Sequence, residues 1–258
     1  MRAPAVAGAF YPADPRALAN AVDGLLAAAG GRAGPAPKAL VAPHAGYVYS
    51  GPIAARAFAA LGESATRIRR VVLLGPAHRV PLRGMAVPAA ERFATPLGSI
   101  PVDHEAAARA GVPTSEIAHR FEHSLEVEVP FLQRLLPAGF SLVPLVVGDA
   151  SPAEVGRVLE ALWDGPETLV VVSSDLSHYL PYDVARATDA ETAEIVLALD
   201  LEALSHDRAC GASPLAGLIW VARRKGLRPV LLDLRNSGDT SGDRDDGVVG
   251  YGAFAFHE

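Results

Sequence analysis

The chain alternates short runs that are apolar at every position with longer segments that begin at helix-capping residues. The short runs are rich in β-branched residues, and strands that are apolar on both faces are typical of a sheet covered by helices on each side. We predict five such strands, at residues 40–42, 71–74, 142–147, 169–172 and 230–232. Residues 248–256 alternate large and small side chains and predict a last strand.

Three segments carry the signature of a helix start, a short polar residue followed by proline. Asp14, Ser151 and Ser213 each precede a proline, whose fixed φ suits the first position of a helix. Glu154 lies three residues after Ser151 and completes a capping box. Strands that alternate with helices are typical of the α/β class. We therefore predict one α/β domain over residues 1–258, with a mostly parallel or mixed central sheet and helices on both faces.

Histidines follow three of the predicted strands. His44, His78 and His178 each lie shortly after an apolar run. The carboxyl ends of strands in an open α/β sheet form the crevice where ligands bind, and imidazoles in one crevice are typical of a metal or acid–base site. For His44 alone, a hydrogen bond to its own loop is the alternative. Asp175, three residues before His178, either acts with it as ligand, base or orienting acid, or caps the next helix.

A fourth histidine, His123, opens an acidic segment at residues 122–130. Glu126 and Glu128 alternate there with apolar side chains, which indicates either a short strand or a solvated helix face. His123 is a candidate catalytic residue, and it would reach the crevice from its rim together with Glu126. The alternative is an exposed acidic segment with no role in the site.

Two further features have alternative interpretations. Residues 236–243 combine carboxylates, hydroxyls and glycines shortly after a predicted strand, and they either supply an oxygen ligand or form a plain surface loop. Cys210 is the only cysteine. It is either a reactive thiol or, as is more common for a lone cysteine, a buried small hydrophobe.

Composition narrows the classes of function. Half of the 258 residues are apolar and the net charge is −6 with scattered Lys and Arg, which argues against a nucleic-acid surface. One cysteine excludes an internal disulfide and fits a reducing cytoplasm. We find neither a signal peptide nor the apolar stretch of about 20 residues that a membrane span needs. High Ala, Arg, Gly and Pro usage indicates a GC-rich bacterial genome. Motifs of nucleotide-binding loops, zinc fingers, zinc proteases and α/β-hydrolases are absent.

Taken together and in this order, several segments resemble the Memo family, which is named for a mediator of cell motility. They span nearly the whole chain. The resemblance implies a fold similar to the class III, LigB-type extradiol ring-cleaving dioxygenases, enzymes that use non-haem iron(II). The matching segments are residues 7–12 (AGAFYP), 42–47 (APHAGY), 74–78 (LGPAH), 122–126 (EHSLE), 173–178 (SSDLSH) and 210–211 (CG).

The resemblance also implies roles for individual residues. In the dioxygenases two histidines and a carboxylate hold the iron, and His44 and His78 fall on the histidine positions, with His178 on the acid–base position. Animal Memo proteins have a cysteine as third ligand. The matching region here contains Asp239 and Thr240. Asp239 would restore a two-histidine, one-carboxylate triad and favour iron(II) over copper(I). The alternatives are Thr240, a poor ligand, or water.

Three functions remain open at this point. The first is a metal-dependent redox enzyme that uses iron(II) or copper. The second is a non-catalytic protein that binds a peptide or small molecule in a vestigial dioxygenase crevice. The third is metal-assisted hydrolysis with His178 as the base. We expect a cytoplasmic protein that binds neither nucleic acid nor membranes, and the sequence contains no readable determinant of the substrate.

Overall fold

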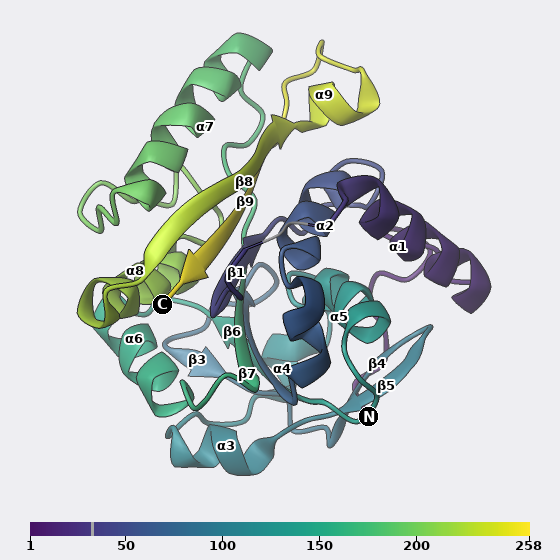
Figure 1. Ribbon diagram of the computed structural model, residues 1–258, viewed down its shortest axis with the longest axis vertical. Helices are drawn as coiled ribbons and strands as arrows, with labels where there is room; N and C mark the ends of the chain where they lie inside the picture. Colours follow the sequence, from purple (N-terminus) through teal and green to yellow (C-terminus); the bar gives the residue numbers. More distant parts are fainter. Residues whose placement is uncertain (32–33) are drawn as a thin grey trace.

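A seven-stranded mixed sheet forms the centre of the computed structural model, which describes residues 1–31 and 34–258 (Figure 1). The strands follow the order β3-β6-β2-β7-β1-β9-β8 across the sheet. A separate hairpin is formed by β4 and β5. The strands are β1 (Ala39–Ala42), β2 (Arg70–Pro76), β3 (Met85–Ala86), β4 (Arg92–Thr95), β5 (Gly98–Pro101), β6 (Ser141–Val147), β7 (Thr168–Ser173), β8 (Arg228–Asn236) and β9 (Gly250–His257).

The four middle strands β6, β2, β7 and β1 run parallel to one another. At the sides of the sheet, β3 pairs antiparallel with β6, β9 with β1, and β8 with β9. The carboxyl ends of β2, β7 and β1 are therefore neighbours at one edge of the sheet, although these strands are far apart in sequence. This arrangement confirms the predicted α/β class with a mixed sheet. The hairpin of β4 and β5 was not predicted, because its two strands have only four residues each.

Helices cover both faces of the sheet (Figure 1). One core lies between the sheet and α1, α2 and α5, and the other lies between the sheet and α6 and α8. The helices are α1 (Pro15–Ala29), α2 (Gly51–Ala59), α3 (His104–Arg109), α4 (Glu116–His119), α5 (Val129–Leu135), α6 (Pro152–Ala161), α7 (Tyr182–Leu197), α8 (Ala212–Lys225) and α9 (Ser237–Ser241), and 3₁₀ turns occupy Gly62–Arg67 and Glu126–Glu128.

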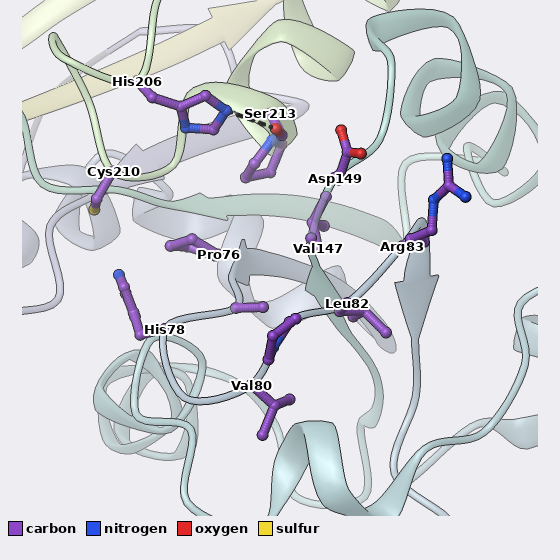
Figure 2. A pocket seen from close by; sticks show the side chains of 14 residues that line it. Pro76, His78, Val80, Leu82, Arg83, Val147, Asp149, His206, Cys210 and Ser213 are labelled. Atoms are coloured by element: carbon purple, nitrogen blue, oxygen red, sulfur yellow. Dashed lines mark hydrogen bonds between the residues drawn. The ribbon is translucent and has the colours of Figure 1, made fainter.

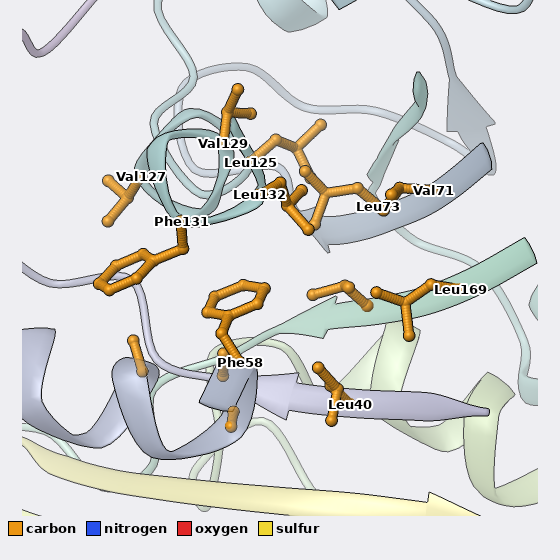
Figure 3. Close-up of a cluster of buried hydrophobic side chains, with 14 of the residues drawn as sticks. Leu40, Phe58, Val71, Leu73, Leu125, Val127, Val129, Phe131, Leu132 and Leu169 are labelled. Carbon is orange, nitrogen blue, oxygen red and sulfur yellow. The ribbon is translucent and has the colours of Figure 1, made fainter. Parts of the chain in front are cut away.

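The two cores explain why the central strands are apolar at every position. Along β2, Val71 and Leu73 pack into the core with α2 and α5, whereas Val72 and Leu74 pack into the core on the other face. Successive side chains of a strand point to opposite faces, so both sets must be apolar. Figure 3 shows Leu73 in the first of these cores. Each such fully buried side chain stabilises the fold by about 1.5–3 kcal/mol.

The predicted helix starts are confirmed at two of three positions. Asp14 caps α1, and Ser151 and Glu154 form the predicted capping box of α6. Ser213, however, lies inside the first turn of α8, which begins at Ala212 without a side-chain cap. No helix in the described part of the chain combines the length and the apolar character that crossing a bilayer requires.

The acidic segment at residues 122–130 differs from both predicted structures. It is neither a strand nor a solvated helix face, but a 3₁₀ turn that leads into α5, and both Glu126 and Glu128 are fully buried. The alternating pattern was misleading because each buried carboxylate contacts a polar side chain far away in sequence. Glu126 forms an ion pair with Arg2, and the Glu128 Oε1 lies 2.9 Å from the Ser173 hydroxyl oxygen.

Candidate metal centre

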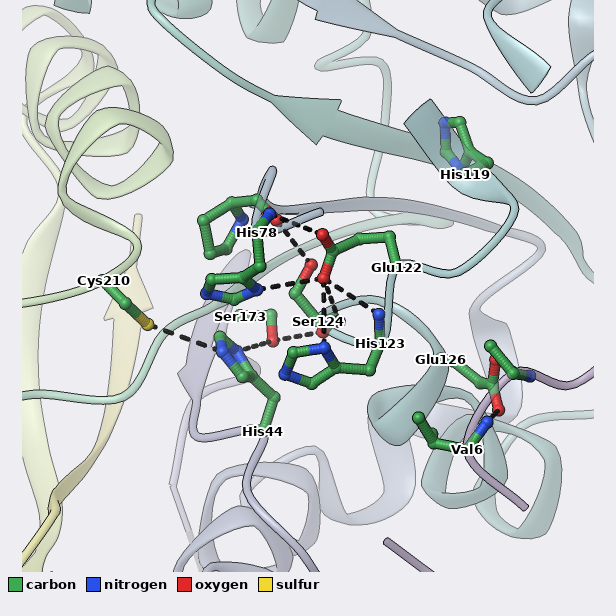
Figure 4. Close-up of polar contacts among 12 residues, drawn as sticks. Val6, His44, His78, His119, Glu122, His123, Ser124, Glu126, Ser173 and Cys210 are labelled. Atoms are coloured by element: carbon green, nitrogen blue, oxygen red, sulfur yellow. Dashed lines mark hydrogen bonds and ion pairs between the residues drawn. The ribbon is translucent and has the colours of Figure 1, made fainter. Parts of the chain in front are cut away.

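Three histidines converge at the carboxyl ends of β1 and β2. His44 follows β1, His78 follows β2, and His123 lies in the loop before α5. Their ring centroids are 4.8–5.6 Å apart (Figure 4). Each offers one ring nitrogen, and these three atoms lie within 4.8 Å of one another. Over residues 1–31 and 34–258, no other group of three His, Cys, Asp or Glu residues offers such an arrangement.

The His44 ring is held by a buried hydroxyl. Its Nδ1 lies 2.7 Å from the Oγ of Ser173, the last residue of β7, and that hydroxyl donates to the Ser124 carbonyl at 2.6 Å. Ser173 therefore accepts the Nδ1 proton of His44, which leaves the His44 Nε2 unprotonated. Burial, and then the charges of His78 and His123, hold the pKa of His44 well below its usual value. The ring is neutral at physiological pH.

Glu122 organises the other two histidines (Figure 4). Its carboxylate accepts hydrogen bonds from the His78 backbone N–H at 2.6 Å and the His78 Nδ1 at 3.0 Å, and from the amides of His123 and Ser124 at 2.9 and 3.0 Å. Burial alone would raise the pKa of Glu122, but the His78 contacts and the amides lower it to about 2. A carboxylate that holds the far nitrogen of a histidine is typical of metal sites.

His123 completes the cluster and has an unusual property. Its Nδ1 is buried and has no hydrogen-bond partner among the described residues. Burial, opposed in part by the charge of Glu122, lowers the pKa of His123 to about 4, so the ring is neutral. Buried polar atoms are normally satisfied, and neutral imidazole is the form in which histidine binds metal. The residues present therefore fit a transition-metal ion.

The amino-terminal segment packs against the His123 ring. Glu126, three residues further on, is buried under this segment, where it accepts hydrogen bonds from the amides of Ala5 and Val6 at 2.7 and 3.0 Å and pairs with Arg2. Phe10 then packs its ring 4.8 Å from the His123 ring. Glu126 was expected to reach the crevice from its rim. It acts instead as the anchor of the amino-terminal segment.

Asp239, expected as the third ligand, is not part of the cluster. Ser237–Ser241 form helix α9 rather than a loop. The Asp239 carboxylate accepts a hydrogen bond from the Asn236 backbone N–H at 3.2 Å and thereby caps the start of this helix. It also accepts from the Tyr182 hydroxyl at 2.5 Å. The Thr240 hydroxyl donates to the Ser237 carbonyl. Local capping uses both side chains, and the third imidazole beside His44 and His78 is that of His123.

His178 lies beside the cluster, but its orientation has a different cause from the expected one. Its Nδ1 donates to the Leu176 carbonyl at 2.8 Å, which leaves Nε2 as the acceptor. Asp175 does not touch His178; it accepts from the His44 backbone N–H at 2.8 Å. Burial raises the pKa of Asp175 to about 7, against the hydrogen bonds from His44 and Ala45. Asp175 therefore supports the turn that carries His44.

Cys210 approaches the cluster as well. Its Sγ lies 3.4 Å from the His44 Nε2 and accepts from the Asp175 amide at 3.3 Å. Cys210 is partly buried, and burial and the charge of Asp175 raise the pKa of the thiol, so it is protonated. No spacing in the chain indicates that Cys210 meets His44 or that Glu122 meets His78, since both contacts cross between elements.

Two cavities adjoin the centre. The first, about 590 Å³, is lined by His78 and Cys210 and by Arg83 and Asp149, and its further wall carries His206 (Figure 2). The second, about 540 Å³, is lined by His123 and His178. Both are large enough for a small molecule.

The fold and the convergent imidazoles define a class, an α/β protein with a candidate metal centre at the carboxyl ends of parallel strands. The chain matches the family model of the Memo-like proteins over residues 2–255, and it belongs to this family. This confirms the resemblance recognised in the sequence. The seven-stranded mixed sheet with helices on both faces is consistent with the LigB-like architecture that the resemblance implied.

Several similar proteins are MEMO1 family proteins of archaea. Those of Methanosarcina barkeri and Methanopyrus kandleri are each 37% identical to this chain, and the alignments cover 98% and 99% of this chain and 98% of each relative. That of Sulfolobus acidocaldarius is 34% identical, with 97% of both chains covered. These archaeal relatives argue against the bacterial origin that composition indicated.

Proposed function

We propose that His44, His78 and His123 bind one divalent transition-metal ion, iron(II) or copper, and that the protein uses it to oxidise a small organic molecule. The observation that supports this proposal is the convergence of three imidazoles whose ligand atoms lie within 4.8 Å of one another. Imidazole is a suitable ligand for iron, copper and zinc. The Nδ1 atoms of His44 and His78 are already engaged, which fixes the tautomers that present Nε2.

A bound divalent ion would supply a Lewis-acid and redox centre that lowers the pKa of a hydroxyl placed on it. The protein surroundings match this role. Burial keeps the His44 and His123 rings neutral, so these two ligands leave the positive charge of an ion to attract an anionic oxygen of the substrate. The ionised Glu122 fixes the orientation of the His78 ring through its Nδ1 and does not line the cavity.

His178 is the proposed acid–base residue. It lines the same 540 Å³ cavity as His123, and its Nδ1 proton is held by the Leu176 carbonyl. Its Nε2 is therefore an acceptor, and burial lowers the pKa of the ring, so that it is neutral at physiological pH. A neutral imidazole beside the cavity can take a proton from a substrate hydroxyl and return it later.

One observation favours a second candidate function, metal-assisted hydrolysis. A set of three histidines without a carboxylate is a known donor set of catalytic zinc, which activates water. In that reaction His178 would take the proton from the water. The non-catalytic binding protein remains the outcome if no metal binds.

Metal analysis of protein purified without added metal tests the proposal. We expect about one equivalent of iron or copper in the wild type. The double variant His44→Ala/His78→Ala should lose it while the circular dichroism spectrum is retained, and His104→Ala, outside the centre, should keep it. Unchanged metal content in the double variant would refute the site.

A second measurement then separates the reactions. Oxygen consumption with catechols by the iron-loaded protein supports oxidation, and its loss in His178→Ala with metal retained supports the acid–base role. Hydrolysis of activated esters by a zinc-loaded protein without oxygen uptake would favour the second candidate.

A further inference from the structure

The second cavity has walls of an unusual composition. Four aromatic rings line it, together with His123 and His178. A volume of about 540 Å³ accommodates a single-ring molecule with a short side chain. Flat aromatic walls favour a flat ligand, because ring faces and edges pack at low entropic cost. The rings are those of Phe10, Tyr49, Tyr179 and Tyr251.

Tyr179 has a strained backbone conformation that burial of its side chain does not offset. Its backbone φ is +55°, a left-handed conformation that costs a non-glycine residue about 1–2 kcal/mol. The side chain is 77% exposed, so burial of the ring returns little of that energy. Its backbone lies against Gly247, where an added Cβ would come within 2.9 Å of the Tyr179 carbonyl oxygen. Strain of this kind gathers at ligand sites, and Tyr179 stands at the mouth of the cavity.

Tyr251 adds a free polar group. The side chain is only 1% exposed, and it lines the cavity. Its hydroxyl has no hydrogen-bond partner within the described residues. Burial, followed by the charge of nearby Asp175, raises the pKa of Tyr251, so the hydroxyl keeps its proton and is available as a donor. Because Tyr251 lines the cavity, a ligand oxygen there could accept the hydrogen bond of its hydroxyl.

The charge of the cavity is negative. The exposed carboxylates Asp243 and Asp246 line it, and no lysine or arginine of the described chain does. Asp243 and Asp246 form no ion pair with any described residue, since the neighbouring Arg244 lies 3.6 Å from Asp239 instead. The first cavity differs, because Arg83 lines it.

We propose that this second cavity binds a small aromatic cation, with its ring between Tyr49 and Tyr179 and its positive end near Asp243 and Asp246. An oxygen at the opposite end accepts a hydrogen bond from Tyr251 and faces the histidines. The assignment of the oxygen-bearing end to the reaction rests on the proposed function. The preference for an aromatic cation does not rest on the proposed function, because it arises from the aromatic side chains and from Asp243 and Asp246.

Three para-substituted phenols of similar size and different charge test the proposal on metal-free protein. They are tyramine, a cation, 4-ethylphenol, which is neutral, and 4-hydroxyphenylacetate, an anion. In calorimetric titrations at low salt, tyramine should bind about fivefold more tightly than 4-ethylphenol, since each exposed carboxylate contributes a modest Coulomb term. The anion should bind most weakly. Equal affinities for the three phenols, or no binding of tyramine, would overturn the proposal.

Variants identify the groups responsible. In Asp243→Asn/Asp246→Asn the preference for tyramine over 4-ethylphenol should fall to about twofold or less. Asp245→Asn, in the same exposed loop but outside the cavity lining, should keep the wild-type preference. A preference that survives in the double variant would refute the role of the two carboxylates.

Tyr179→Gly separates binding from folding. Glycine relieves the left-handed backbone, so the melting temperature should stay the same or rise, while all three phenols should bind more weakly. Unchanged affinities in this variant would refute the aromatic wall. Because these titrations contain no metal, their failure leaves the metal analysis of the three histidines untouched, and a negative metal analysis leaves the titrations untouched.

Discussion

Replacing Glu122 with glutamine should weaken metal binding without removing any proposed ligand. Glu122 accepts two hydrogen bonds from His78 through its two carboxylate oxygens, at 2.6 and 3.0 Å, and two more from the amides that follow. A glutamine keeps one oxygen and presents an N–H₂ group in place of the other. That group would face an N–H of His78, so one orienting contact becomes repulsive.

The size of the effect follows from the role of such contacts. Loss of a partner that orients a metal-binding histidine typically costs 10–100-fold in metal affinity, which corresponds to about 1.4–2.7 kcal/mol. We expect Glu122→Gln to fall within this range for cobalt(II), a stable probe ion, in competition with a fluorescent chelator. The loss should be present throughout pH 6–8, because the pKa of Glu122 is lowered to about 2 and the wild-type carboxylate is ionised there.

Glu160→Gln is the matched control. Glu160 forms a surface ion pair with Arg224 at 2.9 Å, so its replacement removes the same charge far from the centre. It should leave cobalt(II) affinity within about twofold, since surface pairs contribute little. A Glu122→Gln protein that is folded by circular dichroism and binds cobalt(II) as tightly as the control would refute the reasoning.

Two predictions concern the stability of the fold. His119 is buried, and burial lowers its pKa from 6.5 to about 4, so the unfolded chain takes up the proton first. Stability from this group is complete above pH 6.5 and is lost as the pH falls toward 4, by about 3 kcal/mol. Urea titrations should show a correspondingly smaller loss of unfolding free energy in His119→Phe, and identical pH profiles would contradict the assignment. Phe58 is fully buried and stacks on Phe131 with ring centroids 5.2 Å apart (Figure 3), so Phe58→Ala should cost about 3–5 kcal/mol in the same assay. Phe121→Ala, at a position 61% exposed, should change stability by less than about 0.5 kcal/mol, and similar losses in both variants would count against the packing argument.

The sequence determined what depends on local pattern. Runs that are apolar at every position identified the four parallel central strands, because strands covered on both faces need apolar residues throughout. The fifth run, residues 230–232, was wrongly expected to be such a strand, because it belongs to β8, which lies at the edge of the sheet and is only partly buried. The caps at Asp14 and Ser151 were readable because a cap and its helix are neighbours in the chain. His44 and His78 were placed correctly at strand ends for the same reason, since parallel strands bring their carboxyl ends to one edge of the sheet.

Tertiary structure decided which side chains meet at that edge. Asp239 looked like a loop ligand, but the capping of α9 uses its carboxylate, and His123 takes its place among the histidines. Glu126 looked exposed, yet it lies beneath an amino-terminal segment more than a hundred residues away in sequence. Such partners carry no periodicity, because a contact between distant loops leaves no spacing in the chain. They exist only after the sheet and helices have packed, when burial makes each unpaired carboxylate or imidazole costly enough to select its partner.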